Sequence, residues 1–168
     1  MAIRPAVLYP GRVLKSPCGP VGSIGEPEQQ LAQDLVDTMY DNPGCVGVAA
    51  PQIGVASRAF CLDVGVMRKP PPGHHGLLVL FDPELLAATG SDRGREGCLS
   101  VPDFTCDVRR ATEVVVRGTT PKGASRVVEA TGFEARALQH ELDHLDGTLI
   151  LDRVASARTD VHPRTRYR

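Results

Sequence analysis

Two histidines four residues apart, His140 and His144, constrain the fold of this chain more than any other feature. At about 100° per residue, positions i and i+4 of an α-helix lie nearly above one another, so both imidazoles can converge on one point. The spacing therefore predicts a helix that presents two nitrogen ligands to a metal ion. Glu141 lies beside this line, where its carboxylate can take a proton from an attacking water and pass it to a leaving amine. The pattern indicates a metal-dependent amide hydrolase; the alternative is a helix with two hydrogen-bonded histidines and surface acids.

The helix that carries this pattern is predicted to begin at Thr131 and to end near Asp146. The residues from Thr131 to Glu134 have the form of a capping box, and Asp146-Gly147 is a typical helix end. One face of the helix carries leucines and another carries the histidines: Leu138, Leu142 and Leu145 against Phe133, Ala137, His140 and His144. Because a helix that is apolar on two faces must be covered on both, we expect it at the centre, surrounded by β structure.

Strand-like segments outnumber helices in the rest of the chain. A second helix is predicted to begin at a capping-box pattern, Ser23 to Glu26, and to stop at Asp41-Asn42-Pro43-Gly44. Strands are expected over residues 59–64, 77–81, 106–117 and 125–130, and the Pro/Gly loop before the second of them holds His74 and His75 in solvent. Strands and helices do not alternate regularly. We therefore expect an α+β fold, with mixed and antiparallel β-sheets packed around a central metal-binding helix.

Length and composition are those of one soluble domain. The 168 residues are 42% hydrophobic and 23% charged, so residues 1–168 are expected to form a single metallohydrolase domain with a short polar tail from about 154. The 19 basic and 20 acidic residues nearly cancel, which predicts no nucleic-acid or membrane partner. The arginine-rich end, residues 164–168, is expected in solvent. An odd count of five cysteines and no secretory pattern predict reduced thiols and a cytoplasmic location.

A catalytic metal ion needs a third protein ligand and one open position. Among the acids after His144, Asp146 is too near in sequence to swing round, and no glutamate follows. The upstream segment Glu96-Gly97-Cys98-Leu99-Ser100 offers a thiolate, and Gly97 lets a backbone come close to the metal. A lone cysteine is, however, more often a small buried hydrophobe than a ligand.

A third segment, residues 45–54, is rich in small residues that allow close approach of a ligand or of the central helix. Gln52 is a neutral amide in this apolar run, which suggests a placed hydrogen-bond donor. The alternative is a capped turn with Gln52 in solvent.

Together the three segments resemble the peptide deformylase family of bacterial type. The matching motifs are Ala-Ala-Pro-Gln up to Gln52, Glu-Gly-Cys-Leu-Ser at 96–100, and Gln-His-Glu-Leu-Asp-His-Leu-Asp-Gly at 139–147, within a resemblance that runs from about residue 3 to about 153. It implies a metal-dependent hydrolase that removes the N-formyl group from the N-terminal formyl-methionine of newly synthesised polypeptides, by attack of a metal-bound water assisted by Glu141. It also implies a cytoplasmic bacterial enzyme that works near the ribosome.

The resemblance implies a role for each matching position. The metal ligands would be Cys98, His140 and His144, usually to Fe(II), with Zn, Ni or Co as substitutes. The Gln52 side chain and the Leu99 backbone N–H would hold the formyl oxygen as it becomes an oxyanion. Substrate binding would involve Gly47 and Gly97, which pair with its backbone, and Val46, Phe133 and Ala137, which line the methionine pocket.

Two positions depart from the family pattern. Cys45 stands where glycine is common and adds a second thiol near the site, and Thr105 stands where relatives often carry an arginine. The second departure affects one contact to the peptide chain of the substrate. Metal-bound histidines usually donate their other N–H to an acceptor. Glu96 and Asp143 are the candidate acceptors, and Arg109 or Arg110 could form an ion pair with either of them. The alternative is that these four residues form ordinary ion pairs at the surface.

Two other functions fit some of these residues. A zincin-type endopeptidase with an atypical thiolate ligand would cleave unformylated internal peptide bonds. A structural metal domain or inactive binding module would hydrolyse nothing, but structural zinc sites are usually closed by four protein ligands. The metal itself is left open, because one thiolate and two imidazoles suit Zn, Fe(II), Ni and Co.

Overall fold

The computed structural model describes residues 3–164 of the 168-residue chain. The tail beyond residue 164, expected in solvent, lies outside the described residues. The helical segments are η1 (Arg12–Lys15), α1 (Glu26–Asp41), η2 (Ala50–Ile53), η3 (Val64–Val66), α2 (Gly132–Leu145), α3 (Ile150–Arg153) and α4 (Ala157–Asp160). The strands are β1 (Gly47–Ala49), β2 (Ala59–Leu62), β3 (Leu78–Thr89), β4 (Asp92–Cys98), β5 (Val101–Arg110), β6 (Glu113–Thr119), β7 (Ser125–Thr131) and β8 (Val161–Pro163). Within residues 3–164, no helix has the length and hydrophobicity that crossing a membrane requires.

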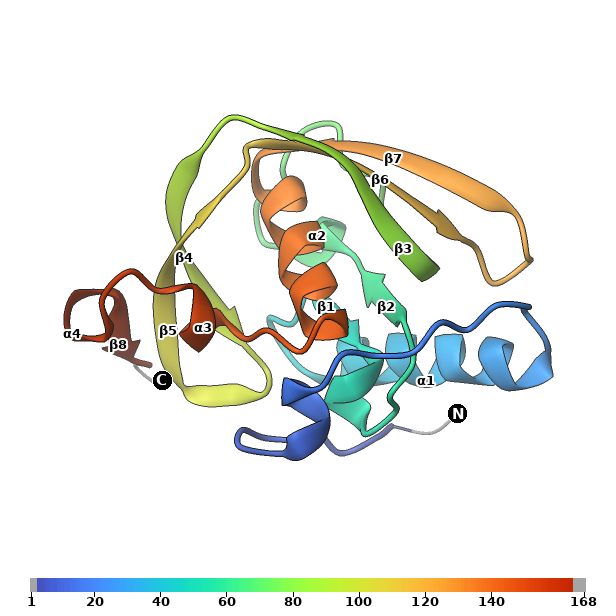
Figure 1. Cartoon of the computed structure of the whole chain (residues 1–168). Coiled ribbons are helices and arrows are strands. Elements are labelled where there is room, and N and C mark those ends of the chain that lie inside the picture. The colour runs from blue at the N-terminus through green and yellow to red at the C-terminus, as the bar shows by residue number, and fades with distance from the viewer. Residues whose placement is uncertain (1–2, 165–168) are drawn as a thin grey trace.

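The strands form two antiparallel sheets that wrap around α2 (Figure 1). The larger sheet has the order β1-β2-β3-β6-β7, and the smaller sheet has the order β4-β5-β8. Strands β1 and β4 are therefore edge strands, one in each sheet. We expected mixed as well as antiparallel sheets. Among the described residues, the parallel pairing is one isolated bridge between Gly19 and Ser57. The expected α+β fold around a central helix is confirmed.

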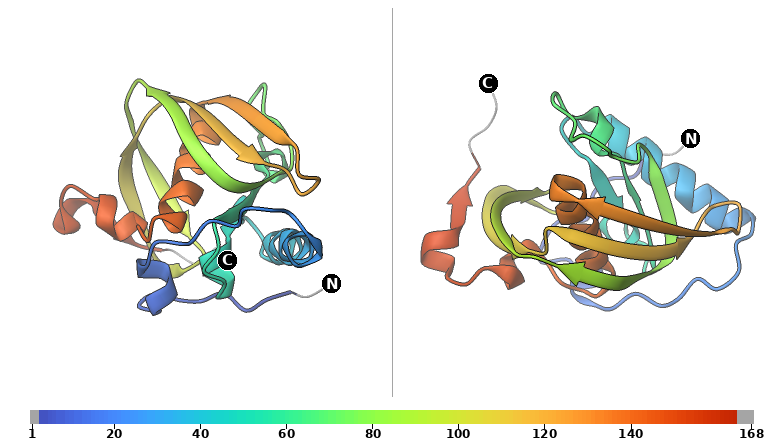
Figure 2. Two further views of the ribbon diagram at one scale, coloured as in Figure 1. Left: turned by 45° about the vertical axis from the view of Figure 1, so that its right-hand side comes forward. Right: turned by 90° about the horizontal axis from the view of Figure 1, so that it is seen from above.

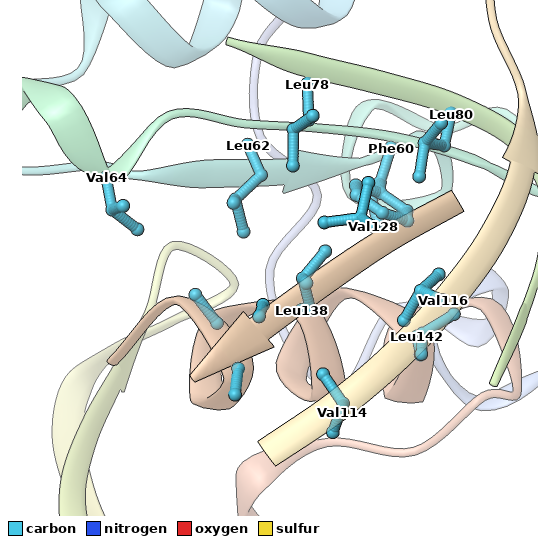
Figure 3. Close-up of a cluster of buried hydrophobic side chains, with 14 of the residues drawn as sticks. Phe60, Leu62, Val64, Leu78, Leu80, Val114, Val116, Val128, Leu138 and Leu142 are labelled. Atoms are coloured by element: carbon cyan, nitrogen blue, oxygen red, sulfur yellow. The ribbon is translucent and has the colours of Figure 1, made fainter. Parts of the chain in front are cut away.

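The leucine face of α2 fixes the rotation of this helix. Leu138, Leu142 and Leu145 belong to one buried cluster with side chains from β2, β3, β6 and β7, including Phe60 and Val116 (Figure 3). Each fully buried leucine contributes roughly 1.5–3 kcal/mol. The opposite face, which carries the two histidines, consequently points towards the end of β4, where Cys98 meets His144. Helix α1 packs on β1, β2 and η2 (Figure 2).

Both long helices begin close to the predicted residues, but without the predicted caps. Helix α1 follows Gly25, whose backbone N–H donates to the Glu28 carboxylate at 2.8 Å, so Ser23 is not the cap. Helix α2 follows Thr131, which makes no side-chain capping hydrogen bond. Its Glu134 pairs instead with His75 at 2.8 Å. His75 is otherwise exposed and does not belong to the cluster of possible metal ligands, as predicted.

The strand boundaries differ more from the predictions. The single strand expected over 106–117 is wrong, because a turn at 111–112 divides it into β5 and β6, which belong to different sheets. Strand β4 was not predicted, since its residues from Asp92 to Glu96 are almost all polar and show no apolar alternation. An edge strand that faces solvent does not need such alternation.

Residues 154–164, treated above as a polar tail, contain regular structure within the described residues. Strand β8 adds to β5, with Thr105 opposite His162. Arg93 on β4 forms ion pairs with Asp160 of this segment at 2.6 Å and with Asp107 on β5 at 3.1 Å. His162 also contacts Asp107, at 3.1 Å. The segment is thus attached to the smaller sheet by both backbone and charged contacts.

Candidate metal centre

Three side chains that could hold a metal ion, from two separate segments, meet at the centre of the fold. The Sγ atom of Cys98 and one nitrogen each of His140 and His144 all lie within 4.8 Å of one another. The two Nε2 atoms are 3.2 Å apart, and Cys98 Sγ lies 3.4 Å from His144 Nε2. Tetrahedral zinc bond lengths would place two nitrogens about 3.3 Å apart and a sulfur about 3.6 Å from a nitrogen. The donor spacing therefore fits one metal ion of this size.

The local structure explains why these side chains converge. His140 and His144 occupy one face of α2, as the i and i+4 spacing predicts. Cys98 is the last residue of β4, where the pairing with β5 changes register between Gly97 and Cys98. Such an irregularity redirects a side chain out of the regular alternation of a strand. The thiol is buried and reaches the histidines from the opposite side of the site.

A buried charge network holds the outer nitrogen of His140. Its Nδ1 donates to Glu96 at 3.0 Å, and Glu96 receives two further hydrogen bonds from Arg110, at 2.8 and 2.9 Å. Arg110 also donates to Asp143 at 2.5 Å, and Arg153 donates to the same carboxylate. Arg110, rather than Arg109, is thus the partner of both acids, and these are not surface ion pairs. An acceptor on the outer nitrogen fixes the ring with Nε2 towards the metal.

The electrostatics of these groups favour an anionic Glu96. Burial raises its pKa, but hydrogen bonds from Arg110 and His140 outweigh burial and lower it to about 2. Burial, with smaller effects of His140 and Arg110, lowers the pKa of His144 well below its usual value and keeps this ring in the neutral form that binds metals. Burial also lowers the pKa of His140, but hydrogen bonds with Cys98 and Glu96 raise it overall, so a metal must displace a proton there.

Glu141 directly follows His140 in the sequence, and its side chain is buried. Its Oε2 atom has no hydrogen-bond partner among the described residues. The other oxygen lies against Gly47 on β1, because a Cβ added to Gly47 would be 2.5 Å from Oε1. Burial raises the pKa of Glu141 to about 7. A carboxyl group with such a pKa can both accept and donate a proton near neutral pH.

Gln52 is buried beside the thiol rather than exposed. Its Oε1 accepts a hydrogen bond from the Ala49 backbone at 3.0 Å, which orients the amide. Its Nε2 then donates to Ser100 Oγ at 3.2 Å and approaches Cys98 Sγ at 3.6 Å. The alternative of a solvated turn is thereby excluded. Leu99, which follows the thiol, is half-buried against the cluster that contains α1 and β1.

The remaining candidate residues surround the same site. Val46, half-buried, and Ala137, buried, belong to the core beneath it, while Phe133 is 37% exposed at the start of α2. Gly47 and Gly97 lie on the two edge strands, β1 and β4. Gly47 lies against Glu141, and Gly97 directly precedes Cys98, whereas Phe133 is exposed two turns of α2 before His140.

Three features near the site were not predicted. Arg136 on α2 donates to Glu96 at 3.0 Å and to the Val108 carbonyl at 2.8 Å. Glu96 is 40 residues away from Arg136 in the sequence, so no local pattern indicates this contact. The Arg164 side chain lies against Gly97. Cys45 donates to the Gly47 carbonyl at 3.2 Å, and burial, with the nearby Glu141 charge, raises its pKa to about 11, so it is a protonated thiol.

Known proteins are similar to this chain in sequence. The family model described as polypeptide deformylase matches residues 3–160. The chain is 40% identical to peptide deformylase 1 of Bacillus subtilis over 160 residues, which are 95% of this chain and 95% of that protein.

Two solved structures extend this likeness to three dimensions. The peptide deformylase of Thermotoga maritima has a TM-score of 0.83 and 31% identity, covering 93% of this chain and 100% of that one. The Met-Ala-Ser-bound class I type b enzyme of Acinetobacter baumannii has a TM-score of 0.82 and 33% identity, covering 91% and 99%. On the family match, the identity and the shared fold, the chain belongs to the polypeptide deformylase family.

Proposed function

We propose that Cys98, His140 and His144 hold one divalent metal ion and that Glu141 transfers the proton in the hydrolysis of a formyl group. As a member of its family, the protein is a peptide deformylase, a metal-dependent hydrolase that acts on formyl-methionyl peptides and releases formate. The observation that carries the residue assignment is the meeting of three donors at metal-ligand spacing beside a buried carboxylate with one unpartnered oxygen.

The metal is proposed to be Fe(II), as the family resemblance implies, with Zn, Ni or Co as substitutes. One thiolate and two imidazoles suit all four ions. A bound ion supplies Lewis acidity, which activates water and polarises the carbonyl of the substrate. The three donors come from this chain, and no fourth His, Cys, Asp or Glu joins the cluster within residues 3–164. This composition supports a catalytic site, because a structural site is usually closed by four protein ligands.

Glu141 is proposed as the general acid and base. The carboxylate takes a proton from the attacking water and later gives it to the nitrogen of the leaving methionine. A pKa of about 7, raised by burial, suits both steps at neutral pH. Gly47 supports this role, since the absence of a side chain leaves room for the carboxylate against β1.

The Gln52 amide and the Leu99 backbone N–H are proposed to stabilise negative charge on the formyl oxygen. Gln52 has the features of a preorganised donor, because its carbonyl end is held by Ala49 and its nitrogen points at the thiol and Ser100. Donors fixed before the reaction need no reorganisation as charge develops. In a site this crowded, the small formyl group is accommodated more easily than an acetyl group.

Substrate binding is proposed to use an apolar pocket and the two edge strands. Val46, Phe133 and Ala137 would contact the methionine side chain. Gly47 and Gly97 would pair with the peptide backbone, since an edge strand offers unpaired N–H and C=O groups to an extended chain. We further propose that residues 1–168 form one domain that acts on nascent chains near the ribosome in the bacterial cytoplasm.

Formate release from formyl-Met-Ala-Ser tests the activity. Protein prepared anaerobically with Fe(II), the same protein with Zn, and a chelated sample are compared with acetyl-Met-Ala-Ser as the control substrate. We expect formate from the formyl peptide with either metal, none after chelation, and at least a hundredfold slower turnover of the acetyl peptide. Cleavage of unformylated internal peptide bonds without formate would instead favour an endopeptidase, and no hydrolysis with any divalent metal would favour a structural metal domain.

A further inference from the structure

The side chain of Arg164 reaches the backbone of Gly97, one residue before the thiol of Cys98. A Cβ added to Gly97 would collide with Arg164 Nη2 and would lie 3.2 Å from its Cζ. The backbone N–H of Arg164 donates to the Asp103 carbonyl at 2.8 Å, which continues the pairing of β8 with β5. The guanidinium is therefore laid against the edge strand β4 beside the candidate metal centre.

The register of the smaller sheet explains how an arginine on β8 reaches β4. Gly97 lies opposite Thr105 on β5, and Thr105 lies opposite His162 on β8. Residues directly opposite one another project to the same face, and Arg164, two residues beyond His162, also points that way. Because Thr105 between them is short, the long side chain of Arg164 can cross β5 to Gly97.

Charged contacts hold the segment that carries Arg164 in place. Asp160 and Asp107 both pair with Arg93, and His162 pairs with Asp107. Asp160 also accepts hydrogen bonds from the backbone of residues 155 and 156, which ties the turn before β8 together. The position of Arg164 is thus set by a connected group of contacts.

The guanidinium has no carboxylate partner in the part of the chain that the structure describes, as none of the ion pairs there includes Arg164. It carries only hydrogen-bond donors, and it lies at an exposed glycine on the open edge of β4. A peptide extended along that edge would bring its carbonyl oxygens to this position. Charge-assisted hydrogen bonds to such oxygens are stronger than neutral ones.

We propose that Arg164 is a substrate-binding residue whose guanidinium donates hydrogen bonds to the carbonyl oxygens of the residues that follow formyl-methionine. The inference rests on the proposed function and deepens it, by giving this deformylase a contact with the peptide chain of its substrate.

Steady-state kinetics of Arg164→Ala tests this role on the metal-loaded full-length protein. We expect KM for formyl-Met-Ala-Ser to rise about tenfold, with a smaller change in kcat, because one charge-assisted contact is lost. Formyl-methionine amide, which lacks the following residues, should be affected less, and Arg164→Lys should recover part of the loss. Arg126→Ala, on β7 in the other sheet, removes an equal charge as the control. An unchanged KM would overturn the proposal, and so would a lower KM, which would identify Arg164 as a blocking contact.

Calorimetric binding of Met-Ala-Ser provides a readout that does not depend on turnover. The Kd should rise about tenfold in Arg164→Ala and should fall again when Thr105→Arg is added to that variant. If wild-type protein releases no formate, the proposed function fails, while the difference in Kd still tests Arg164. Equal Kd values, or no binding of Met-Ala-Ser by the wild type, would overturn the proposal.

Discussion

Two buried glutamates near the metal centre have opposite acid–base properties. The Glu96 carboxylate accepts hydrogen bonds from Arg110, Arg136 and His140. Burial raises its pKa, but the hydrogen bonds from Arg110 and His140 lower it to about 2, so it is an anion. Burial raises the pKa of Glu141 to about 7, and its Oε2 has no partner among the described residues. Groups whose environments separate their pKa values in this way divide their roles. Glu96 is thus suited to orient His140, and Glu141 is the group that we propose transfers the proton.

Replacement of Glu96 by glutamine tests the orienting role. A neutral amide cannot satisfy Arg110, Arg136 and His140 together, so His140 loses its fixed orientation. Loss of such an outer partner typically weakens metal binding by about 10–100-fold. Competition with a chromophoric chelator measures the metal Kd.

Glu84→Gln is the matched control, because Glu84 pairs with Arg117 at the surface. A metal Kd within twofold of wild type in Glu96→Gln would show that Glu96 does not support the site.

The sequence predicts these residues unequally. His140, Glu141 and His144 are found by local spacing, because one turn of helix places them together. Cys98 becomes convincing only through its resemblance to a family motif, since a single thiol has no periodicity. Arg110 was predicted only as one of two alternatives, with Arg109. The contacts of Arg136 and Arg164 are with residues far away in sequence, so no local pattern indicates them.

At the scale of elements, the C-terminal segment contributes more than its composition indicates. Residues 161–163 are too few to show a strand pattern, yet they extend the smaller sheet and direct Arg164 across it. Strand β4, which ends in Cys98, was also not predicted, because its polar residues show no strand pattern. In contrast, α2 was predicted nearly to the residue, because its two apolar faces and its Asp-Gly ending are local signals.

Acid should loosen β8 from the smaller sheet. Hydrogen bonds from Arg95 and His162 lower the pKa of Asp107 to about 2, against a weaker effect of burial. Because an unfolded aspartate has a pKa of about 3.9, this contribution is complete above about pH 4 and is lost as the pH falls towards 2. Hydrogen exchange of the Arg164 amide, corrected for the intrinsic rate, should accelerate over that range.

Asp107→Asn should weaken this acid dependence, with the Arg93–Asp160 pair still in place, and should leave Arg164 less protected at neutral pH. Asp92→Asn, on the exposed start of β4, should behave as wild type. Equal protection of the Arg164 amide at pH 7 and pH 2.5 in the wild type would show that Asp107 does not hold the segment.

At the scale of the whole molecule, two sheets enclose one helix and leave an edge strand of each sheet beside the metal centre. The α+β class follows from the balance and order of elements in the sequence. The division of strands between two sheets does not, because it depends on pairings such as β3 with β6 that join residues far apart. The overall arrangement places Cys98 and His144 in the interior and leaves Gly47 and Gly97 on edge strands of the two sheets, where we propose that the substrate peptide pairs.

The account depends most on Glu141 acting in hydrolysis at a metal centre formed by Cys98, His140 and His144. Bound metal and formate release should therefore be measured on the same anaerobic Fe(II) samples of wild type and Glu141→Ala, with Glu129→Ala on β7 as the control. We predict one metal ion per chain in all three proteins. Formate release from formyl-Met-Ala-Ser should fall by about 10²–10⁴-fold in Glu141→Ala alone. Unchanged turnover in Glu141→Ala with its metal retained would contradict the account.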